Sequence, residues 1–110
     1  MSKTTLIYGS GAMGSFLGAC LFKSGHKVYL LSRKKNYDSI NKYGLKINIF
    51  NNNLLLKKIH LKKNKKFIFV KSIKEIKIKS IDNIFITTKI TSNIKNIFTQ
   101  VERFVSKKTL

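Results

Sequence analysis

The hydrophobic pattern at the start of the chain predicts a strand, a tight turn and a helix. Residues 4–8 are a short apolar, β-prone run that ends directly on Gly9, as a buried strand feeding a turn does. Beyond the turn the period becomes helical from about Ala12 to Ser24, and Gly25 ends this helix. Its apolar stripe, and thus its buried face, is expected at Met13, Phe16, Leu17, Cys20 and Leu21.

A second apolar run, Val28 to Leu31, completes a βαβ unit of about 30 residues. Because a right-handed crossover makes the two strands parallel, this unit predicts an α/β fold, a doubly wound parallel sheet of the Rossmann type. The 110 residues allow one domain of this kind.

The middle of the chain predicts shorter elements. Asp38 is a suitable N-cap for a brief helix that runs to Tyr43 and stops at Gly44. Apolar and polar residues alternate over 45–49, asparagines follow at 51–53, and a second run covers 54–60. This order predicts a small inserted hairpin.

The last third predicts two strands and a helix. Residues 67–70 and 84–88 are the strands, the second preceded by Asp82, and helical spacing then extends through Ile94, Ile97, Phe98, Val101 and Val105. Two interpretations of the segment between the strands stay open. Ser72 and Glu75 have the spacing of a capping box for a turn or two of helix, whereas the alternation over 75–79 favours a strand.

The turn from Gly9 to Gly14 is the first candidate site, with the sequence Gly9-Ser10-Gly11-Ala12-Met13-Gly14. In such turns the first glycine allows a sharp bend, the second lets a pyrophosphate approach the backbone, and the third lets the helix pack closely on the strands. The helix N-terminus presents N–H groups and a partial positive charge to the phosphates. Because the turn lies between a strand and an amphipathic helix, we interpret it as a dinucleotide-binding turn.

The end of the second strand decides which dinucleotide is expected. NAD-binding proteins normally have an acid there for the ribose hydroxyls. This chain instead has Ser32-Arg33-Lys34-Lys35, and its first carboxylate is Asp38. One charge-assisted hydrogen bond is worth about 1.5–3 kcal/mol, so Arg33 predicts a roughly ten- to hundredfold preference for NADP(H).

The charge of the chain raises the question of nucleic acid as a partner. Lys and Arg number 23 against 4 Asp and Glu, a net charge of +19. Arginine, which nucleic-acid readers favour, occurs only at 33 and 103, while residues with A/T-rich codons abound. The densest lysine cluster, residues 57–79, alternates with apolar residues, as on a solvated face. We therefore do not expect a nucleic-acid partner.

Other classes are set aside on similar grounds. No apolar run approaches the roughly 20 residues of a membrane span, and the start lacks a signal-peptide pattern, so a cytoplasmic protein without a membrane partner is expected. Cys20 is assigned to the core of the first helix, and His26 to a structural role. His60 has no Cys, His or acidic cluster near it, so no metal site is expected.

These segments resemble the ketopantoate reductase (2-dehydropantoate 2-reductase) family, specifically its N-terminal NADP-binding domain, over essentially the whole chain. The similar stretches are residues 7–14, residues 24–28 leading to Ser32 and Arg33, residues 43–47, and residues 82–89. The first two recur in many dehydrogenases, so the last two carry the assignment. The last looks like the family's fourth strand, which ends in a cofactor-site lysine, here Lys89.

The resemblance implies roles for the candidate residues. Gly9 to Gly14 would hold the pyrophosphate, Ser32 and Arg33 the adenosine end with its 2′-phosphate, and Lys89 would lie beside the cofactor. The implied reaction is NADPH-dependent reduction of 2-dehydropantoate to pantoate, for pantothenate and coenzyme A synthesis. The family's catalytic residues lie in a helical C-terminal domain. No catalytic residue is therefore expected in residues 1–110, which would form an incomplete Rossmann domain, inactive by itself.

The expected function is thus the NADP(H)-binding part of a 2-dehydropantoate 2-reductase. Its partners would be a small 2-oxo acid, as substrate of the intact enzyme, and a complementary C-terminal chain. A nucleotide-sensing module without chemistry is one alternative, and a nucleic-acid-binding protein that uses residues 57–79 is another. An incomplete sheet would expose an apolar edge, so poor solubility is also expected.

Overall fold

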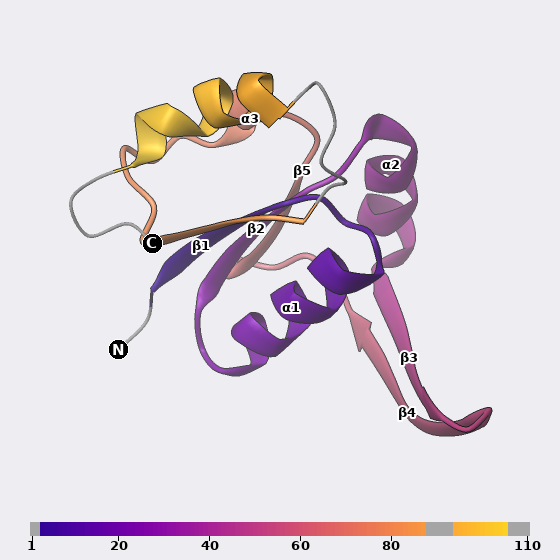
Figure 1. The fold of residues 1–110 in the computed structure, drawn as a ribbon. Helices are drawn as coiled ribbons and strands as arrows, with labels where there is room; N and C mark the ends of the chain where they lie inside the picture. Colours follow the sequence, from indigo (N-terminus) through magenta and orange to yellow (C-terminus); the bar gives the residue numbers. More distant parts are fainter. Residues whose placement is uncertain (1–2, 88–93, 106–110) are drawn as a thin grey trace.

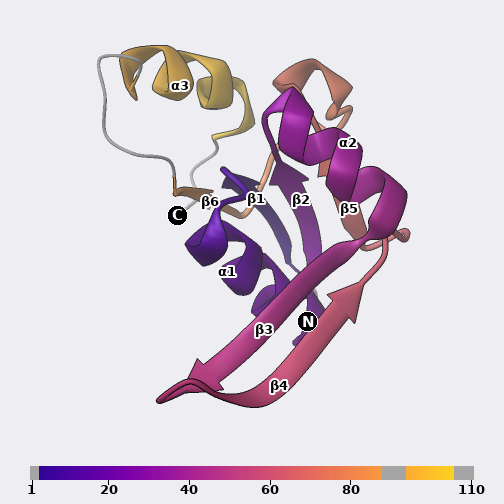
Figure 2. The ribbon, with the colours of Figure 1, turned by 90° about the vertical axis from the view of Figure 1, so that its right-hand side faces the viewer.

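The centre of the computed structural model, which describes residues 3–87 and 94–105, is a parallel sheet with the strand order β5-β2-β1-β6 (Figures 1 and 2). Its strands are β1 (Thr4–Tyr8), β2 (Lys27–Leu31), β5 (Phe67–Val70) and β6 (Asn83–Ile86). Each neighbouring pair is parallel. The predicted Rossmann-type α/β sheet is confirmed.

Helices cover both faces of this sheet (Figures 1 and 2). One face carries α1 (Ala12–Lys23) and α2 (Lys34–Tyr43), and the other carries α3 (Ile94–Val101) with the short 3-10 turns η1 (Ile73–Glu75) and η2 (Glu102–Phe104). Side chains alternate along each strand, so Ile7 and Leu30 enter the core under α1 and α2, while Leu6 and Tyr29 enter the core under α3. No helix in the described part of the chain is long and apolar enough to cross a membrane.

The predicted hairpin is confirmed as β3 (Leu45–Asn51) paired antiparallel with β4 (Leu54–Leu61). Asn52 and Asn53 form its turn with φ angles of 50° and 66°, which asparagine tolerates better than most residues. The hairpin leaves the end of α2 and extends away from the parallel sheet (Figure 1). Its far end exposes Phe50 and the leucines 54–56.

The expected buried face of α1 is right for Leu17 and Leu21, which pack against the core, and wrong for its other three residues. Met13 and Phe16 are 74% and 46% exposed, and Cys20, assigned to the core, is also exposed. The buried residues are the small ones, Gly14, Ser15, Gly18 and Ala19. A Cβ at Gly18 would lie 3.3 Å from Ile7 Cδ1, so the helix lies too close to the sheet for large side chains on that face. Of the expected stripe, Met13, Phe16 and Cys20 face solvent, whereas Leu17 and Leu21 are partly buried and pack against the core.

The predicted start of α2 is also wrong. The helix begins at Lys34, directly after β2, and Asp38 lies in its middle rather than at its N-cap. The N-cap is Arg33, whose carbonyl accepts a hydrogen bond from the Tyr37 N–H at 2.8 Å, so the backbone starts the helix without a capping side chain. The end at Gly44 is as predicted, with φ at +87°.

The structure resolves the open question between β5 and β6. The capping box forms one turn, η1, in which Glu75 Oε2 accepts from the Ser72 N–H at 2.9 Å, and residues 76–79 form no strand. The strand expected at 84–88 ends at Ile86, and residue 88 lies outside the described residues. On the last helical stretch Ile97 and Val101 are buried, whereas Phe98 and Val105 are exposed, and α3 ends at Val101.

Candidate nucleotide-binding site

The candidate site lies at the carboxyl ends of the parallel strands. Gly9 follows β1, Ser32 follows β2 and Thr87 follows β6. Backbone hydrogen bonds hold these exits together, because the Gly9 N–H donates to the Leu31 carbonyl at 3.0 Å and the Thr87 N–H to the Tyr8 carbonyl at 3.0 Å. Open α/β sheets bind their ligands outside this edge.

Glycine is required at both ends of the turn. Gly9 has a φ of +124°, which residues with a side chain rarely adopt. A Cβ at Gly14 would lie 2.1 Å from the Gly9 carbonyl oxygen and 2.6 Å from Thr87 Oγ1. A Cβ at Gly11 would meet nothing within 4 Å, so the space in front of this residue is open to a ligand.

Unpaired hydrogen-bonding groups gather at this turn. Among the described residues, none provides a backbone acceptor for the N–H groups of residues 10–14, and Gly11 caps α1 without a side-chain bond. The buried hydroxyls of Ser10 and Ser32 also have no partner there. Buried polar groups are normally paired, and phosphate oxygens are acceptors that such donors fit. The turn is therefore suited to a phosphate-bearing cofactor.

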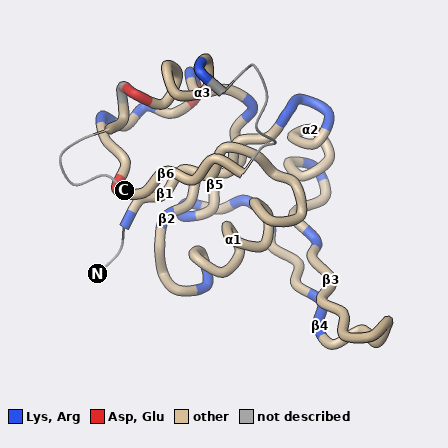
Figure 3. The backbone as a smooth tube through the Cα atoms, in the orientation of Figure 1, with Lys and Arg blue, Asp and Glu red and all other residues tan. Residues whose placement is uncertain are grey.

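Cations follow the second strand, at the start of α2. Arg33, Lys34 and Lys35 are all exposed, and the first turn of the helix contains no acidic residue. Figure 3 shows Lys and Arg at this end of α2, and also spread over the hairpin and the region after β5. The cations add to the positive end of the α2 dipole, so this position favours an anion such as a ribose phosphate.

A hollow of about 570 Å³ lies beside the glycine turn. Its walls combine Ser10 to Ala12 and Ser15 with the polar side chains Asn36 and Ser39 of α2, and with β3 residues. Neither Ser32 nor Arg33 lines it. Their i, i+3 spacing places Asn36 and Ser39 on one helix face. Sequence reasoning missed this pair because the helix predicted from Asp38 contained Ser39 but not Asn36.

The match to a family model decides the relationship. The model described as ketopantoate reductase PanE/ApbA matches residues 5–110. The chain belongs to the ketopantoate reductase family. This is a family of oxidoreductases, and no curated protein sequence matches the chain significantly.

Solved structures agree with this family assignment. The chain is similar to 2-dehydropantoate 2-reductase from Methylococcus capsulatus, with 25% identity, a TM-score of 0.68 and 96% of the chain covered. It is similar to a putative 2-dehydropantoate 2-reductase from Enterococcus faecalis, with 25% identity, a TM-score of 0.69 and 97% covered. A D-mandelate dehydrogenase, solved with NADH and anilino(oxo)acetate, matches with 27% identity, a TM-score of 0.70 and 96% covered. The chain spans 31% of the length of each of these three proteins.

The structure brings most of the candidate residues of this ketopantoate reductase family member to one edge. Gly9 to Gly14 and Ser32 meet at the strand ends, and Arg33 begins the neighbouring helix. Lys89 lies outside the described residues. Among the residues that are described, no group of His, Cys, Asp or Glu side chains is arranged to hold a metal ion. His26 has a structural contact, since its Nδ1 accepts from the Lys3 N–H at 3.2 Å.

Proposed function

We propose that the chain binds NADP(H) at the glycine turn, as the cofactor-binding part of a 2-dehydropantoate 2-reductase in pantothenate and coenzyme A synthesis. The observation that carries this proposal is the turn itself, where the N–H groups of residues 10–14 lack backbone partners among the described residues beside a cationic helix start. Family membership supplies the reaction class. The proposed location is the cytoplasm.

The proposed roles follow the geometry of the edge. The turn amides bind the pyrophosphate, Arg33 binds the 2′-phosphate, and the unpaired Ser32 hydroxyl is available to the adenosine end. Lys89 is proposed to lie beside the cofactor, as the family resemblance implies. The bound nicotinamide would supply the hydride for reducing a 2-oxo acid.

Catalytic residues are proposed to come from a complementary C-terminal part. Support comes from β6, which ends the sheet among the described residues and whose outer edge has no strand partner there. Such an edge can accept a further strand. We propose that residues 1–110 form an incomplete Rossmann domain, inactive until this edge is completed.

A second candidate substrate is a 2-oxo acid other than 2-dehydropantoate. The D-mandelate dehydrogenase match has the same coverage as the 2-dehydropantoate 2-reductase from Methylococcus capsulatus and an identity of 27%. Assay of the protein with its complementary part against 2-dehydropantoate and aryl 2-oxo acids separates the two substrates.

Fluorescence titration with NADPH and NADH tests the cofactor. NADPH is expected to bind about ten- to a hundredfold more tightly, and Arg33→Ala should remove most of this difference while leaving NADH affinity nearly unchanged. Lys42→Ala is the matched control, because it removes one cation from the far end of the same helix. Equal affinities in the wild type would contradict the role of Arg33. Absence of nucleotide binding together with tight, salt-sensitive DNA association would favour the nucleic-acid alternative instead.

A further inference from the structure

The orientation of the peptide groups in the glycine turn determines whether the turn can bind a phosphate. Each peptide group carries both an N–H donor and a carbonyl acceptor, and only the donors attract a phosphate. A turn that presents its carbonyls outward would repel the same ligand. A phosphate-binding turn therefore needs hydrogen-bond donors within the protein that keep its carbonyls pointing inward.

Hydroxyl groups hold two of these carbonyls. Thr87 Oγ1 donates to the Gly9 carbonyl at 3.0 Å, with the Tyr8 carbonyl also near at 3.3 Å. Ser15 Oγ donates to the Ser10 carbonyl at 2.8 Å, and the Ser15 N–H donates to the Gly11 carbonyl at 2.9 Å. The carbonyls from Tyr8 to Gly11 are thus engaged from inside the protein, while the N–H groups of residues 10–14 are not.

We propose that Thr87 and Ser15 are positioning residues, whose hydroxyls fix the carbonyls of Gly9 and Ser10 inward so that the amides of the turn face the pyrophosphate. This inference rests on the proposed nucleotide-binding function. Neither residue belongs to the glycine motif, and neither is required to touch the cofactor.

The sheet delivers Thr87 to this place. Tyr8 pairs with Ile86 in the parallel register of β1 and β6, so Thr87, the residue that follows β6, lies beside the start of the turn. The absence of a side chain at Gly14 leaves room for the hydroxyl, since a Cβ there would lie 2.6 Å from Thr87 Oγ1. Gly14 and Thr87, which are far apart in the sequence, therefore interlock at the turn.

Ser15 reaches the turn from the other side. It lies in the first turn of α1 and is only 7% exposed, so its hydroxyl is held in place by packing. A buried hydroxyl can rotate its single hydrogen toward only one acceptor, and the Ser10 carbonyl takes that position. The two hydroxyls thus act on successive peptide groups.

The test compares hydroxyl removal with hydroxyl retention. Thr87→Val and Ser15→Ala remove one donor each, and Thr87→Ser keeps it. In titrations of the chain, Thr87→Val is expected to raise the Kd for NADPH and for NADH by the same factor, roughly tenfold, whereas Thr87→Ser stays within about twofold of the wild type. Arg33→Ala instead changes the ratio of the two constants, which separates positioning of the pyrophosphate from recognition of the 2′-phosphate.

A matched control excludes a general effect of losing a threonine hydroxyl. Thr99 Oγ1 donates to the Lys95 carbonyl at 3.0 Å on α3, so Thr99→Val breaks the same kind of bond away from the turn and should leave both constants unchanged. Urea unfolding of every variant gives its folded fraction under the titration conditions. If Thr87→Val fails to fold, Ser15→Ala and Thr87→Ser carry the comparison.

The outcomes separate the two proposals. A wild type that binds NADPH, together with folded Thr87→Val and Ser15→Ala variants of unchanged affinity, overturns the positioning role and leaves the proposed function standing. A wild type that binds neither nucleotide overturns both. A loss for Thr87→Val that Thr87→Ser does not rescue assigns the effect to packing and also overturns the positioning role.

Discussion

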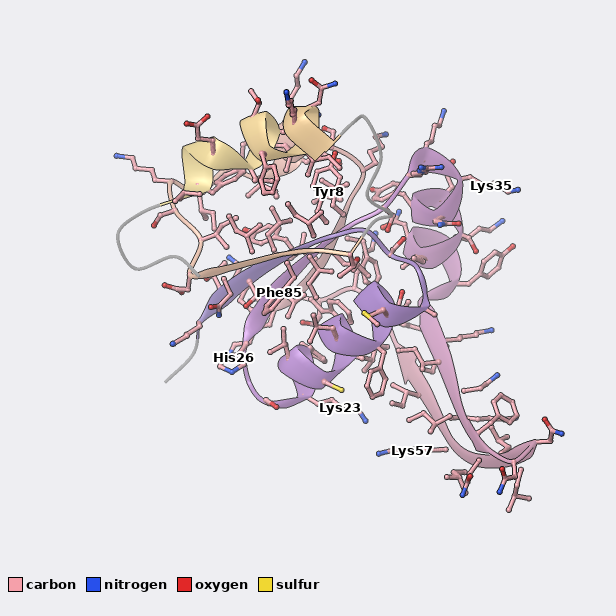
Figure 4. All side chains as sticks on the ribbon, viewed as in Figure 1. Tyr8, Lys23, His26, Lys35, Lys57 and Phe85 are labelled. Atoms are coloured by element: carbon pink, nitrogen blue, oxygen red, sulfur yellow. The ribbon has the colours of Figure 1, made fainter. Side chains whose placement is uncertain are left out.

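The two edges of the parallel sheet differ in how completely they are covered. At the β5 edge Phe67, Phe69 and Val70 are at most 5% exposed, and α2 packs against the strand. Phe67 stacks on Phe22 at 5.1 Å and meets Phe69 edge-on at 5.0 Å. At the β6 edge Phe85 is 39% exposed, and the other residues of the strand are only half-buried. Figure 4 shows the Phe85 side chain on the side of α1.

The edge that contributes most to stability is therefore not the edge that contacts the glycine turn. Buried aromatic area at the β5 edge stabilises the fold, whereas the turn is tied to the less covered β6 edge through Thr87. Tyr8 adds a further link on the α3 side, since its hydroxyl donates to Gln100 Oε1 at 2.9 Å (Figure 4). Parts of a protein with little buried area open at lower free energy than its core. The proposed cofactor site is therefore tied to the less covered side of the sheet, at β6.

The sharpest test of the comparison exchanges one aromatic ring at each edge. Phe67→Ala is expected to lower the free energy of unfolding by about 3–5 kcal/mol, because it leaves a cavity among stacked rings. Phe85→Ala removes a ring that is already partly in water and should cost about 1 kcal/mol or less. Urea unfolding followed by circular dichroism measures both, and equal losses at the two edges would show that β6 is as well covered as β5.

Self-association is the next largest expected effect. A buried phenylalanine ring contributes about 1.5–3 kcal/mol, so Phe85→Lys should weaken association through the open edge by at least about tenfold. Sedimentation velocity over a range of protein concentrations measures the change. Phe98→Lys is the control, because Phe98 is 57% exposed on α3, which covers the face of the sheet opposite to α1. A wild type that remains a monodisperse monomer would contradict the expected solubility defect.

The smallest effect is expected at Cys20. Because the side chain is exposed on the outer face of α1, Cys20→Ser should change the free energy of unfolding by no more than about 0.5 kcal/mol. The thiol should also react completely with a thiol reagent while the protein remains folded. A thiol that reacts only after the protein unfolds would contradict this prediction and show that Cys20 is buried.

Local patterns in the sequence were sufficient for the order of most elements and for the glycine turn. The strand-turn-helix-strand order and the asparagine turn of the hairpin each depend on neighbouring residues, so periodicity and turn chemistry predict them. The buried face of α1 cannot be predicted from neighbouring residues in this way. Which side of α1 is buried depends on how closely the helix approaches the sheet. The small residues at 14, 18 and 19 indicate this close approach, but the apolar spacing of Met13 and Phe16 is the more conspicuous pattern.

The missed site residues share a different cause. Thr87 meets Gly9 only through the pairing of β1 with β6, which joins segments at opposite ends of the chain. Ser39 and Asn36 line the hollow only because α2 begins at Lys34, where no side-chain cap marks a helix start. Such contacts depend on the order of the strands and the position of the helices, which patterns of neighbouring residues do not predict.

The proposed phosphate-binding turn has a consequence for how this sequence tolerates change. Its donors are peptide groups, which are chemically the same whatever side chains surround them. Drift in composition toward lysine, asparagine and isoleucine therefore leaves these donors intact, provided that the glycines at 9, 11 and 14 and the hydroxyls at 15 and 87 remain. A binding turn made of backbone donors places few requirements on the side chains elsewhere, so it is compatible with a net charge of +19.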